Sequence, residues 1–269
     1  MKCPICFGEE SYLTLNIKGY ELKTCRRCGH AVTDPLPGPD ELAALYNEAY
    51  FAAHYPEIRP ADRGFKKRIR QEDHRVKLIR RHKKRGRLLD VGCGRGYFLY
   101  ACKPYFACTG FDITTRNQGF IEQDLGVDFF SPAADRVSAA GLQFEVLTFW
   151  HSLEHFPDPE HQLCLFTNLL AEDGILIIDV PNHEAIDAFM EGEGWPGWDL
   201  PFHCHHFTRR SLERLVDRLG FEVLAANTYH CGYVRDRLLR KPVTRYFARP
   251  VAKLFPGSSV ALVCRKRAA

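Results

Sequence analysis

The feature that most constrains this chain is a glycine-rich turn between two apolar segments. Residues 88–99 read LLDVGCGRGYFL, the pattern of a buried strand, a tight turn and a helix start. Glycines let the backbone approach a ligand closely, and a helix start offers unpaired N–H groups. Gly92, Gly94 and Gly96 follow a Gly-x-Gly-x-Gly spacing, whereas dinucleotide-binding loops have Gly-x-Gly-x-x-Gly. Asp90 beside the turn disfavours a pyrophosphate and favours a ligand with an ammonium group.

A second carboxylate follows this turn. Asp112 lies twenty residues beyond Gly92, at the end of the next predicted strand. A carboxylate at that place can accept hydrogen bonds from both hydroxyls of a ribose. The two features together therefore predict a ligand that contains a ribose and an ammonium group.

Strand and helix patterns alternate from the turn onward. The strand candidates are Leu88–Val91, Cys108–Ile113, Gly126–Phe130, Phe144–Phe149, Ile175–Val180, Phe221–Asn227 and Ser259–Cys264. Helical patterns fit residues 97–103, 115–124, 158–171 and 208–219. This alternation predicts an α/β fold with a doubly wound, seven-stranded, mostly parallel sheet. Before the turn, we expect a helix capped by Asp40 and one continuous helix over residues 63–84.

Four of the eleven cysteines stand close together at the N-terminus. Cys3-x2-Cys6 and Cys25-x2-Cys28 are separated by 18 residues. Four thiolates in this spacing can form the tetrahedron that Zn²⁺ prefers, and they leave no open position for catalysis. We therefore predict a structural zinc in a small ribbon. The other seven cysteines are scattered and odd in number, which fits a reducing compartment better than a disulfide framework.

A cluster of proline and glycine at residues 35–39 indicates a boundary. We expect a zinc-ribbon-like segment at 1–34, a linker and basic helical segment at 35–87, and the main domain at 88–269 with a substrate-capping insertion at 183–207. No apolar stretch approaches the roughly 18 residues of a membrane span, and the N-terminus lacks a secretory signal. We therefore expect a cytoplasmic protein with no membrane partner.

Positive charge is concentrated in two segments. Residues 63–87 carry thirteen Lys and Arg against two acidic residues, and residues 229–269 carry ten against one. Such segments can bind RNA, a nucleotide-linked substrate or an acidic partner. The alternative is that they are solvated helix faces.

Together these motifs resemble the class I S-adenosylmethionine-dependent methyltransferases. The likeness continues through residues 144–155 (FEVLTFWHSLEH), 174–182 (GILIIDVPN) and 201–208 (PFHCHHFT), then Leu212 and Gly220-Phe221. The pattern is similar to the branch that methylates quinone- and sugar-type small molecules, some members of which carry an N-terminal zinc-binding segment. The resemblance implies a Rossmann-like methyltransferase fold and S-adenosylmethionine as cofactor. One departure is Glu145, where the family usually has Asp.

The resemblance also implies roles for individual residues. The methionyl part would lie against the glycine backbone, with Asp90 near its ammonium group, Asp112 on the ribose and Ile113 over the adenine. Trp150 and His151 would line the methyl-donor pocket. The residues expected at the cofactor are Asp90, Gly92, Gly94, Gly96, Asp112, Ile113, Trp150 and His151.

Three histidines are candidates for the proton transfer that some acceptors need: His203, His155 and His151. His203 ends the 183–207 insertion, so we expect it to contact the acceptor more directly than His155, whose alternative role is to fix a loop. Trp195 and Trp198 in the same insertion are interpreted as a mobile lid, with core packing as the alternative.

The resemblance favours methyl transfer to a small molecule, such as a sugar nucleotide or another biosynthetic intermediate. An alternative is an RNA methyltransferase in which the ribbon and the basic 63–87 segment bind phosphates. A third alternative is a noncatalytic protein that only binds S-adenosylmethionine.

Overall fold

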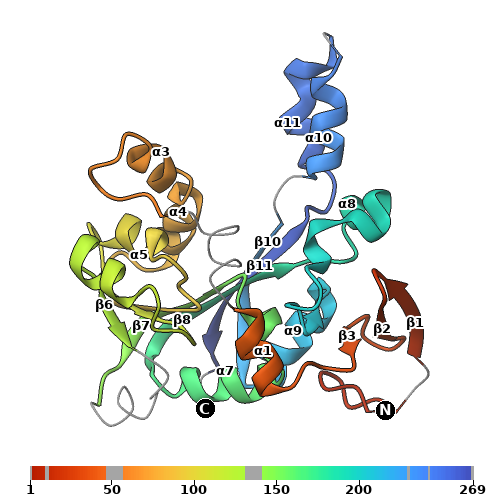
Figure 1. The fold of residues 1–269 in the computed structure, drawn as a ribbon, viewed down its shortest axis with the longest axis horizontal. Coiled ribbons are helices and arrows are strands. Elements are labelled where there is room, and N and C mark those ends of the chain that lie inside the picture. The colour runs from red at the N-terminus through yellow and green to blue at the C-terminus, as the bar shows by residue number, and fades with distance from the viewer. Residues whose placement is uncertain are drawn as a thin grey trace. The chain divides into compact units, whose positions relative to one another are not determined.

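The computed structural model describes residues 2–9, 12–46, 57–130, 141–228, 231–241 and 243–267 (Figure 1). The chain forms two compact units. Unit 1 comprises Met1–Pro39, His151–Gln162 and Asp179–Arg267, and unit 2 comprises Asp40–Trp150 and Leu163–Ile178 with the last two residues. The expected division at residues 34 and 87 stays a prediction, since the units combine segments that are distant in sequence.

The described strands and helices follow the predicted alternation. The strands are β1 (Tyr12–Ile17), β2 (Tyr20–Cys25), β3 (Ala31–Asp34), β4 (Arg87–Val91), β5 (Ala107–Phe111), β6 (Asp128–Phe130), β7 (Phe144–Trp150), β8 (Leu170–Pro181), β9 (His205–His206), β10 (Phe221–Thr228) and β11 (Ser259–Lys266). The α-helices are α1 (Pro39–Leu45), α3 (Phe65–Arg70), α4 (Asp73–His82), α5 (Tyr97–Cys102), α7 (Pro159–Thr167), α8 (Ile186–Glu191), α9 (Arg209–Arg218), α10 (Gly232–Leu239) and α11 (Ala248–Ala252). Short 3-10 or π turns are η1 (Phe120–Asp124), η2 (Leu153–His155), η3 (Gly192–Gly194), η4 (Pro196–Trp198) and η5 (Thr244–Phe247).

Seven strands form one sheet in the order β10-β11-β8-β7-β4-β5-β6. β4 pairs in parallel with β5 and β7, β5 pairs in parallel with β6, and β10 pairs antiparallel with β11. The predicted fold class is confirmed, and each predicted strand overlaps an observed one. Leu88, Leu89 and Val91 of β4 are all buried, as is usual for a parallel strand covered on both faces, and Asp90 between them is buried too.

Unit 2 contains β4 together with the helices that precede and follow it in sequence. α4 and α5 lie side by side against its parallel strands (Figure 1). The expectation of one helix over 63–84 is wrong, because α3 ends at Arg70 and α4 begins at Asp73. At the break, the buried Glu72 carboxylate accepts from Arg68 Nη1 at 2.5 Å and Arg75 Nη1 at 3.0 Å. The buried carboxylate of Glu72 at this turn therefore has two guanidinium partners.

Other predicted boundaries are corrected too. α1 begins at Pro39, so Asp40 lies inside the helix rather than capping it; proline is favoured in the first turn, where its missing N–H costs nothing. The helix expected at 115–124 begins only at residue 118 and is a π turn over η1, and α7 ends at Thr167 because β8 already begins at Leu170.

Unit 1 contains a second sheet of four strands in the order β1-β2-β3-β9. β1, β2 and β3 form an antiparallel meander, and β9 pairs with β3 through Ala31 opposite His206 and Val32 opposite His205. The N-terminal ribbon therefore gains a strand from residues of the predicted 183–207 insertion.

The same unit carries α10 and α11 between β10 and β11. These two helices lie side by side and stand beyond the ends of the two strands (Figure 1). Among the helices described, none combines the length and apolar character required to cross a bilayer.

Replacing Gly110 by Ala should destabilise unit 2. The added methyl would lie 2.7 Å from Cys93 Sγ and 2.9 Å from Leu99 Cδ1, so that β5, the glycine turn and α5 would have to separate. We expect a loss of about 1–3 kcal/mol in the free energy of unfolding, measured in urea. The matched control is Gly119→Ala, where nothing lies within 4 Å and the backbone is right-handed helical. Equal stability of the two variants would refute the close packing at Gly110.

Candidate functional site

The glycine turn of unit 2 is held in an unusual backbone conformation. Gly92, Gly94 and Gly96 have φ angles of +78°, +54° and +70°, a region that side chains disfavour. The N–H groups of Gly92 and Cys93 both donate to the carbonyl of Phe111, at 2.8 and 3.0 Å. The turn is therefore fixed against the end of β5, which brings the three predicted glycines together.

Asp112 lies directly after β5 and is hydrogen-bonded to the turn. Its Oδ2 accepts from Gly94 N–H at 2.9 Å, and its Oδ1 accepts from Thr114 N–H at 3.2 Å. Burial raises the pKa of this carboxyl to about 6, opposed by the backbone hydrogen bonds. Each oxygen keeps a lone pair for another donor. Asp112 can therefore position the turn and bind hydroxyl groups simultaneously.

Asp90 lies at the end of β4 and is almost fully buried. Its Oδ1 accepts from Thr148 Oγ1 of β7 at 2.7 Å. Burial raises the pKa of Asp90 to about 7, whereas the Thr148 hydrogen bond and the charge of Arg75 lower it. Nothing in the sequence marked Thr148, because its partner is 58 residues away. A nearby positive charge would therefore lower the pKa of Asp90 and favour its ionised form.

The buried polar atoms of unit 2 without a hydrogen-bond partner among the described residues include the indole Nε1 of Trp150, at the end of β7, and the Oδ1 of Asn117. Asn117 is otherwise fixed by donating from Nδ2 to Gly94 O at 3.1 Å. Sequence reasoning missed Asn117, which carries no motif. Ile113, beside Asp112, is 58% exposed and offers an apolar surface. These groups leave one donor, one acceptor and an apolar surface for a ligand near the turn.

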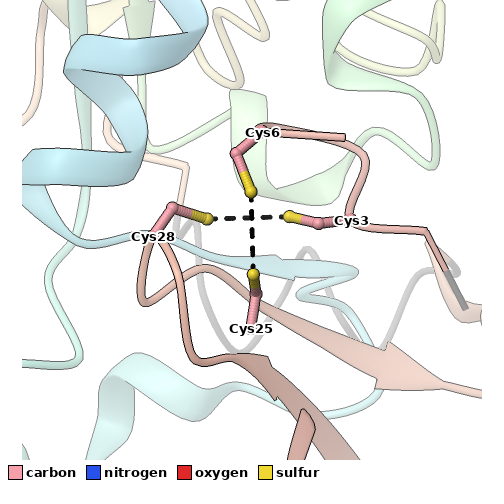
Figure 2. A group of neighbouring side chains, drawn as sticks. All are labelled: Cys3, Cys6, Cys25 and Cys28. Carbon is pink, nitrogen blue, oxygen red and sulfur yellow. Dashed lines mark hydrogen bonds between the residues drawn. The ribbon is translucent and has the colours of Figure 1, made fainter. Parts of the chain in front are cut away.

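The four N-terminal cysteines converge in unit 1. Figure 2 shows their sulfur atoms directed toward a common centre, and all four lie within 4.8 Å of one another. Cys3 Sγ is 3.6 Å from Cys28 Sγ, and Cys6 Sγ is 3.7 Å from Cys25 Sγ. Zinc–sulfur bonds of about 2.3 Å would place tetrahedral sulfurs about 3.8 Å apart. The donor set and its dimensions therefore fit Zn²⁺.

Buried histidines connect the ribbon to the insertion. His30 Nε2 lies 2.9 Å from His205 Nδ1, and His205 Nε2 lies 3.0 Å from Pro157 O. His183 Nε2 donates to Gly29 O at 2.8 Å. Burial lowers the pKa of His30 well below its ordinary range, so its ring stays neutral. These imidazoles have a structural function.

The three predicted catalytic histidines lie in one cluster of unit 1. His151 Nδ1 is 3.5 Å and His203 Nε2 is 3.9 Å from the same atom, Glu154 Oε1. The rings of His155 and His203 contact edge to face, with centroids 4.6 Å apart. Burial and the neighbouring His155 lower the pKa of His203 well below its ordinary range. Glu154 at the centre was not predicted.

A cavity of about 600 Å³ in unit 1 opens beside this cluster. His151 and His203 line one part, and Tyr233 and Arg237 of α10 line another. Asp187, also in the wall, accepts from Gly232 N–H at 3.1 Å and Tyr233 N–H at 2.6 Å, which fixes the start of α10. The cavity is therefore lined by residues of both the 183–207 insertion and the basic C-terminal segment, and the capping function stays a prediction.

The mobile-lid interpretation of Trp195 and Trp198 is wrong. They are 2% and 6% exposed and pack with Ile17 and Leu22 of the ribbon. Trp198 Nε1 also donates to Gly192 O at 2.9 Å. The core-packing alternative holds, because the rings form one buried cluster with Ile17 and Leu22 of the β1–β2 hairpin.

Comparisons with known proteins relate the chain to methyltransferases. A family described as a methyltransferase domain matches residues 64–226. A ubiquinone biosynthesis O-methyltransferase of Parvibaculum lavamentivorans is 30% identical over 132 residues, which cover 46% of this chain and 52% of that protein. The chain spans about half the length of the first curated relatives it matches.

Solved structures share the fold. A SAM-dependent methyltransferase from Archaeoglobus fulgidus has a TM-score of 0.54 at 21% identity, covering 74% of this chain and 94% of that one. Magnesium protoporphyrin IX methyltransferase from Synechocystis, solved with bound SAH, has a TM-score of 0.55 at 12% identity, covering 83% and 97%.

Replacing Asp90 by Asn should change how stability depends on pH. The folded pKa of about 7 exceeds the ordinary 3.8, so the stability that Asp90 contributes is present at low pH and lost as the pH rises toward 7. Between pH 5 and 8, ligand-free wild type should lose stability relative to Asp90→Asn by up to about 1.4 kcal/mol per pH unit. Urea unfolding across this range measures the difference. Asp128→Asn, at an exposed site, is the control, and parallel curves for wild type and Asp90→Asn would contradict the expectation.

Proposed function

This chain belongs to the class I S-adenosylmethionine-dependent methyltransferases, and from that premise we propose that it transfers a methyl group to a small-molecule acceptor. The observation that carries the proposal is the glycine turn hydrogen-bonded to Asp112, with unsatisfied polar atoms on Trp150 and Asn117 close to it in the fold.

The donor is proposed to bind in unit 2. The backbone of Gly92, Gly94 and Gly96 would hold its methionyl part, Asp90 its ammonium group, and Asp112 its ribose. Ile113 would cover the adenine, and Trp150 would line the pocket around the methyl group. His151, which the resemblance also assigns to this pocket, belongs to unit 1, and that assignment stays a prediction. When bound, S-adenosylmethionine supplies an electrophilic methyl carbon on a positively charged sulfur.

Asp112→Asn should weaken S-adenosylmethionine binding by about 1.5–3 kcal/mol, because hydrogen bonds to an ionised carboxylate are lost while the side chain keeps its size. Titration calorimetry measures the affinity, and NAD should show no binding to either protein. Asp124→Asn on η1 is the control. An unchanged affinity in Asp112→Asn would refute the ribose assignment.

The acceptor is proposed to occupy the cavity of unit 1. The similarity to a ubiquinone O-methyltransferase supports a small-molecule acceptor, with a sugar nucleotide as another candidate class. RNA is disfavoured because part of the basic 63–87 segment is already paired within the chain. Arg68 and Arg75 contact Glu72, and Lys83 Nζ contacts Asp173 at 2.6 Å.

In the proposed reaction, an acceptor atom attacks the methyl carbon. The new bond forms as the carbon–sulfur bond breaks, and its electron pair remains on sulfur. A proton lost by the acceptor is taken by one of His203, His155 or His151. His203 is buried at the cavity wall, and its lowered pKa keeps the ring neutral, so that one ring nitrogen carries a lone pair; the same burial makes it a weaker base than an exposed imidazole.

His203→Ala should lower the methylation rate by about 10²–10⁴ while leaving S-adenosylmethionine affinity nearly unchanged. The assay uses labelled S-adenosylmethionine with a metabolite pool and, separately, total RNA. His161→Ala on α7 is the matched control, and the Lys66, Lys67 and Arg70 charge-removal variant tests the RNA alternative. Methylation of RNA alone, lost only in the charge-removal variant, would overturn the small-molecule proposal.

We also propose that Cys3, Cys6, Cys25 and Cys28 bind a structural zinc that stabilises the ribbon of residues 1–34. Main-chain N–H groups already form the turns, since Phe7 donates to Cys3 O and Gly29 to Cys25 O. Eleven free cysteines fit a reducing location such as the cytoplasm. The linker at 35–87, the main domain at 88–269 and the 183–207 insertion complete the proposed organisation.

Cys28→Ser should reduce the zinc content of the purified protein by about one ion per chain and unfold the ribbon, because metal binding and folding are coupled. Elemental analysis gives the zinc content, and hydrogen exchange at β1–β3 reports the fold. Cys164→Ser, at an exposed cysteine, is the control. A ribbon that stays protected without metal would contradict the proposal.

A further inference from the structure

We propose that Glu154, His155 and His203 bind a divalent transition-metal ion at a site separate from the four cysteines. Each of the three side chains offers a ligand atom, and these atoms lie within 4.8 Å of one another. Glu154 and His155 belong to η2, and His203 lies just before β9, all within unit 1. The chain therefore brings two imidazoles and one carboxylate together from segments about fifty residues apart.

The carboxylates of this region lack the partners that buried charges need. Glu154 is 0% exposed and Asp179 is 1% exposed. Neither oxygen of either carboxylate has a hydrogen-bond partner in the described ranges. An uncompensated buried carboxylate costs several kcal/mol, so it is retained where a cation balances it. The histidine nitrogens approach Glu154 Oε1 only to 3.5 and 3.9 Å, which is too far for hydrogen bonds and leaves room for an ion between them.

The two imidazoles are oriented as metal ligands usually are. His155 Nδ1 lies 3.1 Å from Phe202 O, and His203 Nδ1 lies 2.9 Å from Gly197 O. A carbonyl can only accept a hydrogen bond, so the ring proton resides on Nδ1 and Nε2 carries the lone pair. Backbone carbonyls commonly fix metal-binding histidines in this way. For His203, Nε2 is the nitrogen that faces Glu154.

Two further carboxylates would strengthen the attraction for a cation. Asp179 Oδ2 lies 3.8 Å from His151 Nε2, and Asp199 Oδ2 lies 3.8 Å from His203 Nε2. Two imidazoles with one carboxylate are a ligand set for Zn²⁺, Fe²⁺ or Co²⁺ and leave coordination positions open. His203 also lines the cavity of about 600 Å³, so those positions can receive a ligand from the cavity.

A role for this metal in methyl transfer rests on the proposed function. An acceptor hydroxyl bound to the metal would lose its proton more readily, as metal-bound water does. With the metal bound, His155 and His203 would be ligands and no longer proton acceptors, and His151 is the one of the three predicted imidazoles that would take the proton. Its side chain is 41% exposed and lines the same cavity.

A Co²⁺ titration of the untagged full-length protein, prepared free of metal, tests the site without an activity assay. Wild type should bind two ions per chain, one with the intense thiolate-to-cobalt absorption of the cysteine site and one without it. Glu154→Gln and His203→Ala should each lose only the second ion, whereas Cys28→Ser should lose only the first. Glu122→Gln and His161→Ala, on the exposed faces of η1 and α7, are the matched controls.

The wild-type titration decides the proposal even if a variant fails to fold. A single ion with thiolate absorption would overturn it, as would a second ion that persists in folded Glu154→Gln and His203→Ala. Two ions without methylation of any small molecule would contradict the proposed function and leave the metal site standing.

Discussion

One hydrogen bond, from Gly94 N–H to the buried carboxylate of Asp112 at 2.9 Å, ties the glycine turn to the end of β5. The rest of the proposed donor site depends on it. The turn can approach β5 because Gly110 has no side chain, and Phe111 O receives two more N–H groups from the turn. Asp112 is thus held at a fixed place relative to the three glycines before any ligand arrives. This preorganisation is the physical basis for assigning donor binding to unit 2.

Both proposed sites contain buried carboxylates, but the free-energy cost of burying their charge is offset differently at each site. Asp90 and Asp112 accept hydrogen bonds and have raised pKa values, so protonation or a bound cation can offset the free-energy cost of burying their charge. Glu154 and Asp179 are as buried but lack hydrogen-bond partners among the described residues. The first pair fits a cationic organic ligand, and the second fits an inorganic cation near the acceptor cavity.

The glycine turn and the cysteine cluster could be predicted because their determinants are local. Gly92 to Gly96 define a turn within five residues, and each Cys-x2-Cys pair forms its own turn. The predictions that were wrong or incomplete involve contacts between residues that are distant in sequence. The sequence context of Trp195 and Trp198 indicates a mobile lid, but both are buried against a hairpin that precedes them by more than 170 residues in the chain. Thr148 and Glu154 stayed unnoticed because their importance depends on Asp90 and His203, which only the fold brings close.

The affinity of the wild-type chain for S-adenosylmethionine between pH 5 and 8 tests the central assignment most directly. Asp90, with a pKa of about 7, and Asp112, with a pKa of about 6, must be ionised to bind the ammonium and ribose groups. Binding should therefore weaken as the pH falls through this range, by up to about tenfold per pH unit for each carboxylate that protonates. Calorimetry should also detect protons released on binding near pH 6.5. An affinity that is constant from pH 8 to pH 5, with no proton release, would contradict donor binding at these carboxylates.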